Sequence, residues 1–171
     1  MNEEPTGKWI EEIRLQCRFA SHAWQEMRRS LIGMDNEKSF FYVHAFLNHS
    51  MEIAQILWPN NKDCNERGKG LREALKLTED NLLNQSSIRR IVTHFDERLE
   101  LWMGTADPPH FLNLNVMPKG TVADAREDVF VRSFDSETYR LEILDQTFDL
   151  RDLYQTIRQL DKTAETWRKL H

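Results

Sequence analysis

The first sixty residues contain two long segments in which apolar side chains recur at helical spacing. In residues 8–31 the apolar positions lie three or four apart, which places them on one face of a helix: Trp9, Ile13, Cys17, Ala20, Trp24, Met27 and Leu31. Residues 37–58 are apolar over most of a helical circumference, with Asp35 and Asn36 as N-cap candidates and Pro59 as a stop. We expect two long helices, the second covered on more than one side by its neighbours or by a second subunit.

The middle of the chain predicts a loop, a short helix and a third long helix. Residues 60–70 are polar and contain glycine, and residues 71–77 form a short helical stretch. Residues 80–102 carry a further apolar stripe, made of Ile88, Ile91, Val92, Phe95, Leu99 and Trp102. Gly104, Pro108 and Pro109 are expected to end this helix.

After residue 110 the pattern changes from helical to alternating. Residues 111–116 alternate apolar and polar side chains, and residues 128–134 and 139–144 look like short strands. We expect a two- or three-stranded antiparallel ribbon, after which Asp149 caps a last helix over residues 150–170. The predicted fold is mainly α: one domain over residues 1–171, with a helical bundle at 8–104 and 149–170 and a β-ribbon insertion at 111–147.

Composition narrows the classes of protein that fit this plan. The chain has 171 residues, 40% of them hydrophobic, with five tryptophans, which indicates a folded domain. The formal net charge of -5 is not that of a non-specific nucleic-acid binder, so RNA contact would need a local basic patch. The first candidate patch is Arg67, Lys69 and Arg72. The polar N-terminus and the lack of any apolar run of about 20 residues favour a cytoplasmic protein without membrane association.

The strongest chemical candidate is the group Arg89, Arg90 and His94. A histidine moves protons near neutral pH, and an arginine fork binds phosphate oxygens. Arg90 and His94 lie four apart and share a helix face, whereas Arg89 lies on the opposite flank unless the helix starts or bends near Ser86 or Ser87. An interfacial histidine that hydrogen-bonds to a neighbouring helix fits the same pattern.

An arginine five positions before a histidine, near the start of a bundle helix, resembles the Arg-x4-His motif of the HEPN superfamily. Arg89 and His94 occupy the motif positions, and Arg90 stands where that family usually has Asn, Asp or His. The resemblance implies a compact helical bundle that forms a homodimer and cleaves RNA without a metal or other cofactor, often as a toxin or defence protein with an antitoxin partner. The strings at 45–50, 57–59 and 94–99 also resemble a group of uncharacterised bacterial proteins over about residues 40–102.

Helix 37–58 carries a second polar set, His44 and Asn48, on one side of its apolar surface. Three interpretations stay open for it: buried polar residues bonded to the next helix, a polar wall facing His94, or metal ligands. The spacing lacks the acidic partner of a zinc-protease helix, and we expect no metal site. Cys17 is expected to be a core thiol and Cys64 a loop cysteine.

The function predicted from these patterns is a metal-independent endoribonuclease that uses Arg89 or Arg90 together with His94. The alternative is a catalytically silent helical dimer that binds a protein, such as an antitoxin, or a nucleotide. Burial separates the two: an enzyme needs His94 exposed in a cleft, whereas a structural histidine would be buried in ion pairs with Asp96, Glu97 or a neighbouring helix.

Overall fold

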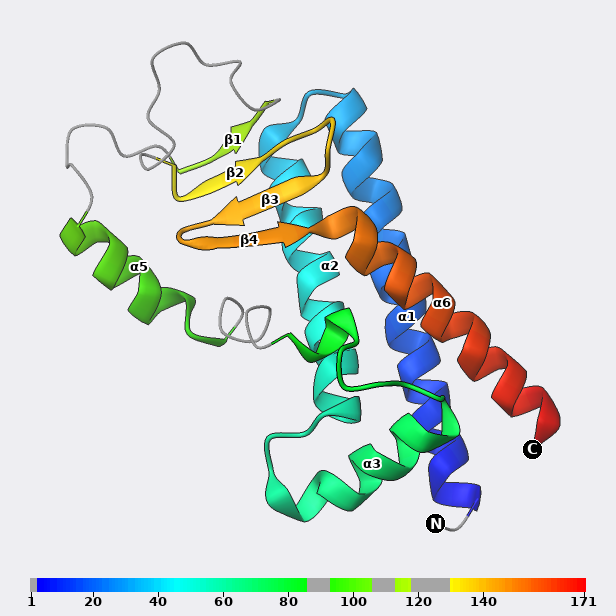
Figure 1. Cartoon of the computed structure of the whole chain (residues 1–171). Helices are drawn as coiled ribbons and strands as arrows, with labels where there is room; N and C mark the ends of the chain where they lie inside the picture. Colours follow the sequence, from blue (N-terminus) through cyan, green and yellow to red (C-terminus); the bar gives the residue numbers. More distant parts are fainter. Residues whose placement is uncertain (1–2, 86–92, 106–112, 118–129) are drawn as a thin grey trace.

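The structure is a computed structural model that describes residues 3–85, 93–105, 113–117 and 130–171 (Figure 1). It is mainly helical, with a small sheet directly before the C-terminal helix. The three long helices are α1 (Glu3–Ile32), α2 (Asn36–Leu57) and α6 (Leu150–Leu170). α1 and α2 form a hairpin, and the sheet lies toward the turn of this hairpin while α3 (Asn65–Ala74) crosses its opposite end.

The predicted apolar stripe of α1 is confirmed in its central five residues, Ile13, Cys17, Ala20, Trp24 and Met27, whereas Trp9 and Leu31 are only partly buried and Ile10 is a core residue outside the predicted stripe. Ile10, Ile13, Cys17, Ala20 and Met27 are buried along α1, which packs against both α2 and α6. Burial strongly raises the pKa of the Cys17 thiol, in keeping with a core residue. The predicted cap is also confirmed, because the Asp35 carboxylate accepts a hydrogen bond from the backbone N–H of Lys38.

The apolar surface of α2 is covered almost completely within the chain. Its buried residues contact α1, α3 and the 3-10 turn η2 (Leu82–Asn84), and only Phe41 leaves most of its side chain, 67%, exposed. The apolar circumference of this helix therefore does not by itself require a second subunit. The homodimer stays a prediction that rests on the resemblance.

The loop predicted at residues 60–70 is wrong over most of its length. A 3-10 turn, η1 (Lys62–Cys64), leads into α3, which begins at Asn65 and includes both glycines. Gly68 is buried because α3 packs its backbone directly against Pro59 and the carbonyl of Leu57. The glycine serves close packing here and does not break the helix.

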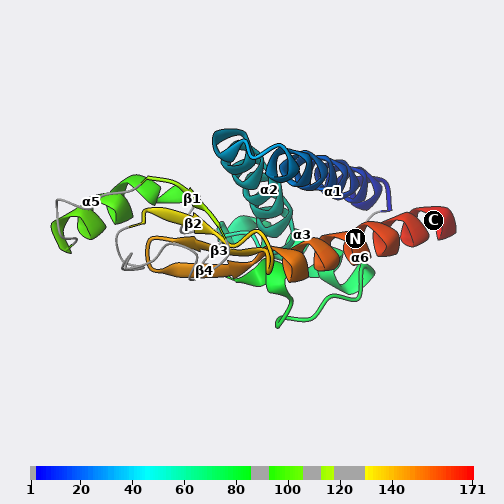
Figure 2. The ribbon, with the colours of Figure 1, turned by 90° about the horizontal axis from the view of Figure 1, so that it is seen from above.

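The continuous helix predicted for residues 80–102 is also wrong. The Asn81 side chain accepts a hydrogen bond from the N–H of Leu83, and the Asn84 side chain donates to the carbonyl of Glu79. These local bonds compete with the helical ladder, and η2 forms instead. α5 (Phe95–Thr105) begins only at Phe95, and residues 86–92 lie outside the described residues. Figure 2 shows α5 and the C-terminal end of α6 at opposite ends of the molecule.

The sheet has four strands, one more than the predicted maximum, and is not purely antiparallel. The strands are β1 (Asn115–Val116), β2 (Arg132–Phe134), β3 (Arg140–Ile143) and β4 (Gln146–Asp149), in that order across the sheet. β2, β3 and β4 pair antiparallel, and β1 pairs parallel to β2. Tyr139 and Leu144 have positive φ angles and bound β3, which shortens the predicted strand at 139–144.

One face of the sheet joins the helical core. Phe134, Leu141 and Phe148 lie opposite one another on β2, β3 and β4, and all three are buried with the helices in one hydrophobic cluster. β4 continues into α6, where the predicted cap Asp149 accepts from two backbone N–H groups of the first helical turn. The described part of the chain contains no helix that is both long and apolar enough to span a membrane.

Candidate functional site

His94 is the one member of the predicted Arg-x4-His group that the structure describes. It directly precedes α5, its side chain is 53% exposed, and its Nδ1 lies 3.5 Å from Oε1 of Glu97. Arg89 and Arg90 lie outside the described residues. The imidazole of His94 is therefore open to solvent, as an enzyme requires, and it lies beside the carboxylate of Glu97, as the structural alternative predicts.

Phe95, the residue after His94, contacts Arg132, an arginine that the sequence pattern did not mark as a candidate. The guanidinium of Arg132, the first residue of β2, lies 4.4 Å from the ring centroid of Phe95, which is a cation–π distance. A further link between α5 and the sheet is the ion pair between Arg98 and Asp145. The fold thus brings the beginning of α5, and His94 with it, to the beginning of β2.

Arg132 also binds the predicted site residue His44. Its Nε donates to Nε2 of His44 over 3.3 Å, and its Nη1 donates to Oδ1 of Asn113 over 2.6 Å. We call His44, Phe95, Asn113 and Arg132 the Arg132 cluster. It is assembled from α2, α5, β2 and the residues before β1, so His44 lies on the same side of the molecule as the start of α5.

The protonation of His44 follows from its surroundings. Burial, and then the positive charge of Arg132, lower the pKa of His44 below its ordinary value, so the ring is neutral near pH 7. A neutral imidazole that accepts a hydrogen bond at Nε2 carries its proton on Nδ1. Burial also lowers the pKa of Arg132, which remains charged because the ordinary value is far above neutral. The cluster therefore holds a fixed positive charge next to a neutral histidine.

Asn48, which was expected to share a wall with His44, is exposed one turn further along α2. The neighbouring His49 binds the side-chain oxygen of Gln16 on α1 and packs against Phe19. Within residues 3–85, 93–105, 113–117 and 130–171 there is no group of three or more His, Cys, Asp or Glu side chains placed to hold a metal ion.

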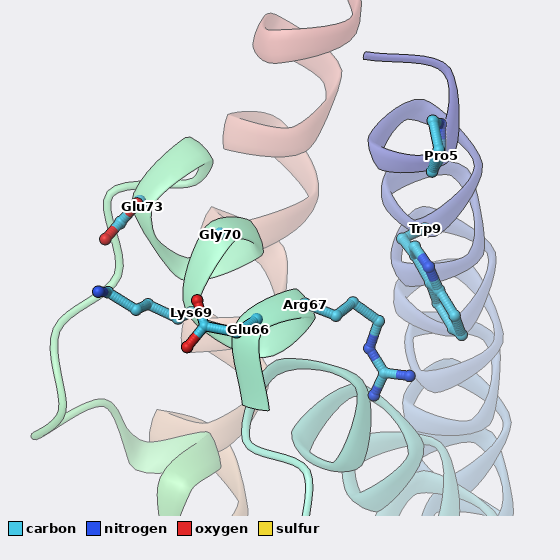
Figure 3. Close-up of a pocket in the computed structure, with 7 residues that line it drawn as sticks. All are labelled: Pro5, Trp9, Glu66, Arg67, Lys69, Gly70 and Glu73. Atoms are coloured by element: carbon cyan, nitrogen blue, oxygen red, sulfur yellow. The ribbon is translucent and has the colours of Figure 1, made fainter. Parts of the chain in front are cut away.

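The predicted basic run separates into three different environments. Arg67 lies over the ring of Trp9 at 4.3 Å from its centroid, and Arg72 donates to the carbonyl of Leu57 and pairs with Glu79. Figure 3 shows Lys69 on the side of α3 that faces away from Trp9. These side chains do not form one continuous basic surface.

Arg67 and Lys69 nevertheless help to line an open pocket of about 580 Å³ between α3 and the start of α1 (Figure 3). Trp9 and Pro5 form its apolar wall, and two glutamates, Glu66 and Glu73, stand among its lining residues. Two cations and two carboxylates leave the pocket without net charge, so its electrostatics do not select an anion such as RNA.

Sequence spacing could not have revealed Arg132 or Asn113 as partners of the predicted site. Arg132 lies 88 positions after His44, and only the folding of the sheet onto α2 brings the two together. The one available signal is that Arg132 occupies a core-facing position, two residues before the buried Phe134 on the same strand.

Comparison with known proteins identifies no relative. The chain matches no protein-family model, no curated protein and no solved structure. The functional argument therefore rests on the chemistry of this site.

Proposed function

We propose that this protein is a metal-independent endoribonuclease, of the toxin or defence type, in which His94 is the general base. The observation that carries the proposal is the exposed position of His94 at the start of α5, next to Phe95 and hence next to the Arg132 cluster. The resemblance of Arg89 and His94 to the HEPN motif supports the same chemistry and adds Arg89 or Arg90 as phosphate-binding residues.

The proposed reaction is attack of a ribose 2′-hydroxyl on the adjacent phosphodiester. Glu97 beside Nδ1 favours the tautomer with its proton on Nδ1, which leaves Nε2 of neutral His94 to accept the 2′-hydroxyl proton. The 2′ oxygen forms a bond to phosphorus, the bond to the 5′ oxygen breaks, and that oxygen takes a proton from solvent. The products are a 2′,3′-cyclic phosphate and a 5′-hydroxyl.

Arginine side chains supply the electrostatic part of this mechanism. Negative charge develops on the phosphate oxygens as the new bond forms, and guanidinium groups stabilise it through charge-assisted hydrogen bonds. Arg89 or Arg90 takes this role in the proposal. His44 acts differently from His94, because its lowered pKa and its bond to Arg132 make it an acceptor that orients the arginine.

The test is an RNA-cleavage assay in EDTA with the wild-type protein and His94→Gln. Loss of a general base should lower the cleavage rate by about 10²–10⁴-fold, with cyclic phosphate ends on the wild-type products. His22→Gln is the matched control, because His22 is an exposed histidine on α1, remote in sequence from the site. Full activity of His94→Gln, or no cleavage by the wild type, would refute the proposal.

One observation favours the alternative of a catalytically silent dimer. Leu101 and Met103, in the second half of α5, are 73% and 51% exposed. Exposed apolar side chains on a helix that packs little against the other described elements favour an interaction surface. Sedimentation of the wild type against Leu101→Glu tests this candidate. A dimer that Leu101→Glu dissociates, together with a wild type that cleaves no RNA, supports it, and a monomeric wild type contradicts it.

A further inference from the structure

We propose that the Arg132 cluster is a phosphate-binding subsite, in which Arg132 holds one phosphate group of the RNA strand. The inference rests on the proposed function for the source of that phosphate. The binding itself does not require cleavage and can be measured separately.

Arg132 has no negatively charged partner among the described residues. The largely buried arginines Arg14, Arg72 and Arg98 each pair with a carboxylate, from Asp161, Glu79 and Asp145 respectively. The partly buried Arg67, by contrast, lies over Trp9 and pairs with no carboxylate of the described residues. Arg132 is partly buried, and no carboxylate of the described residues pairs with it. A charge removed from water is costly unless it is paired, so an anionic ligand would stabilise this guanidinium more than those of the three paired arginines.

The three partners of Arg132 among the described residues are all neutral. The ring of Phe95 faces the guanidinium, the amide oxygen of Asn113 accepts from Nη1, and the imidazole of His44 accepts from Nε. These contacts fix the position of the side chain, and none of these three groups compensates its positive charge. This arrangement is typical of an arginine that is preorganised for an anion.

Arg132 also has N–H donors beyond those that its described partners use. A guanidinium has five N–H groups, and the bonds to His44 and Asn113 use one on Nε and one on Nη1. Among the described residues, no hydrogen bond uses the second N–H of Nη1 or either N–H of Nη2. Adjacent donors on Nη1 and Nη2 form the planar fork that binds two oxygens of one phosphate.

The position of the cluster connects it to the cleavage chemistry. Phe95, which packs on Arg132, directly follows His94 in the chain. The proposed base and the proposed subsite are therefore carried by neighbouring residues at the start of α5. The proposal therefore assigns the scissile phosphate to His94 and another phosphate of the same strand to Arg132.

Titration with inorganic phosphate, followed by NMR of the His44 ring and by calorimetry, tests the subsite. Saturable binding is expected for the wild type, with affinity reduced at least about tenfold in Arg132→Gln. Arg140→Gln is the matched control, because Arg140 is an exposed arginine of the same sheet that pairs with Glu142, and it should bind as the wild type does. Sodium chloride at equal ionic strength should not reproduce the shift at His44.

A second variant keeps the test decisive if Arg132→Gln does not fold. Arg132→Lys retains the charge but lacks the fork, and it should bind phosphate more weakly than the wild type. No saturable shift at His44, or equal affinity in the wild type and the folded Arg132 variants, would overturn the subsite.

Competition with RNA identifies the source of the phosphate. His94→Gln, which binds without cleaving, should bind a short RNA in competition with inorganic phosphate, and the double variant with Arg132→Gln should bind it at least about tenfold more weakly. Phosphate binding without RNA competition would overturn the assignment to an RNA strand. Competition by RNA together with an inactive wild type would leave the subsite standing and refute only the proposed nuclease.

Discussion

Replacement of Gly68 by alanine tests the close contact that holds α3 against the end of α2. A Cβ atom at this position would lie 2.5 Å from Cδ of Pro59 and 2.8 Å from the carbonyl oxygen of Leu57. Neither atom belongs to the flexible end of a side chain, so the backbone of α3 must move away from α2 to accommodate the methyl group.

Three contributions set the expected change in the free energy of unfolding. Alanine in place of glycine favours a helix by about 1 kcal/mol, whereas overpacking of a tight contact costs about 1–3 kcal/mol. The displacement also disturbs the hydrogen bond from Arg72 to the carbonyl of Leu57, and partial loss of a bond to a charged donor costs about 1 kcal/mol. We expect Gly68→Ala to destabilise the protein by about 1–3 kcal/mol.

Urea unfolding followed by tryptophan fluorescence measures this change as a shift in the midpoint. Gly7→Ala is the matched control, because Gly7 lies in helix α1 and a Cβ there meets nothing within 4 Å. The same chemical change should be neutral or stabilising by up to about 1 kcal/mol at that site. A Gly68→Ala protein as stable as the wild type would refute the packing argument.

Two further predictions concern the cap of α6 and the titration of His44. Asp149→Ala should lower the free energy of unfolding in urea by about 1 kcal/mol, because two backbone N–H groups lose their acceptor. The control Asp152→Ala, three residues further along the chain, should lower it by less. Equal losses in the two variants would contradict the capping role of Asp149. Burial and then the charge of Arg132 lower the pKa of His44 from 6.5, so the unfolded chain binds its proton at higher pH. Stability is therefore full above about pH 6.5 and falls as the pH drops below that value. His44→Gln should make this slope shallower, and His49, whose pKa burial also lowers, contributes to the slope that remains. An unchanged slope would refute the prediction.

The elements predicted correctly are those that depend on residues close together in the sequence, within one helical turn or along one face of a single helix. The stripe of α1, the caps Asp35 and Asp149, and the stop at Pro59 each depend on neighbours a few residues away. The errors occur where local and tertiary effects compete. Apolar periodicity favoured one helix over residues 80–102, but bonds from Asn81 and Asn84 to nearby backbone groups stabilise a 3-10 turn instead.

The residues of the candidate site likewise fall into those that the sequence indicated and those that only the structure revealed. His94 and His44 were found from residue type and position on a helix, and the structure places one at the solvent-exposed start of α5 and the other beside Arg132. Arg132 was not found, because its partners come from segments that lie far apart in the chain. The roles of Arg89 and Arg90 stay predictions from the motif.

The sequence by itself determined the apolar stripe of α1, the caps Asp35 and Asp149, and the segments that contain β1, β2 and β3, since each follows from periodicity and from short-range hydrogen bonding. Only the tertiary structure decided how these elements combine. It showed that Gly68 is a packing residue, that the apolar surface of α2 is covered within one chain, and that His44 and Arg132 meet. Burial and long-range contact depend on how distant segments pack in three dimensions, and a linear pattern carries no measure of that distance.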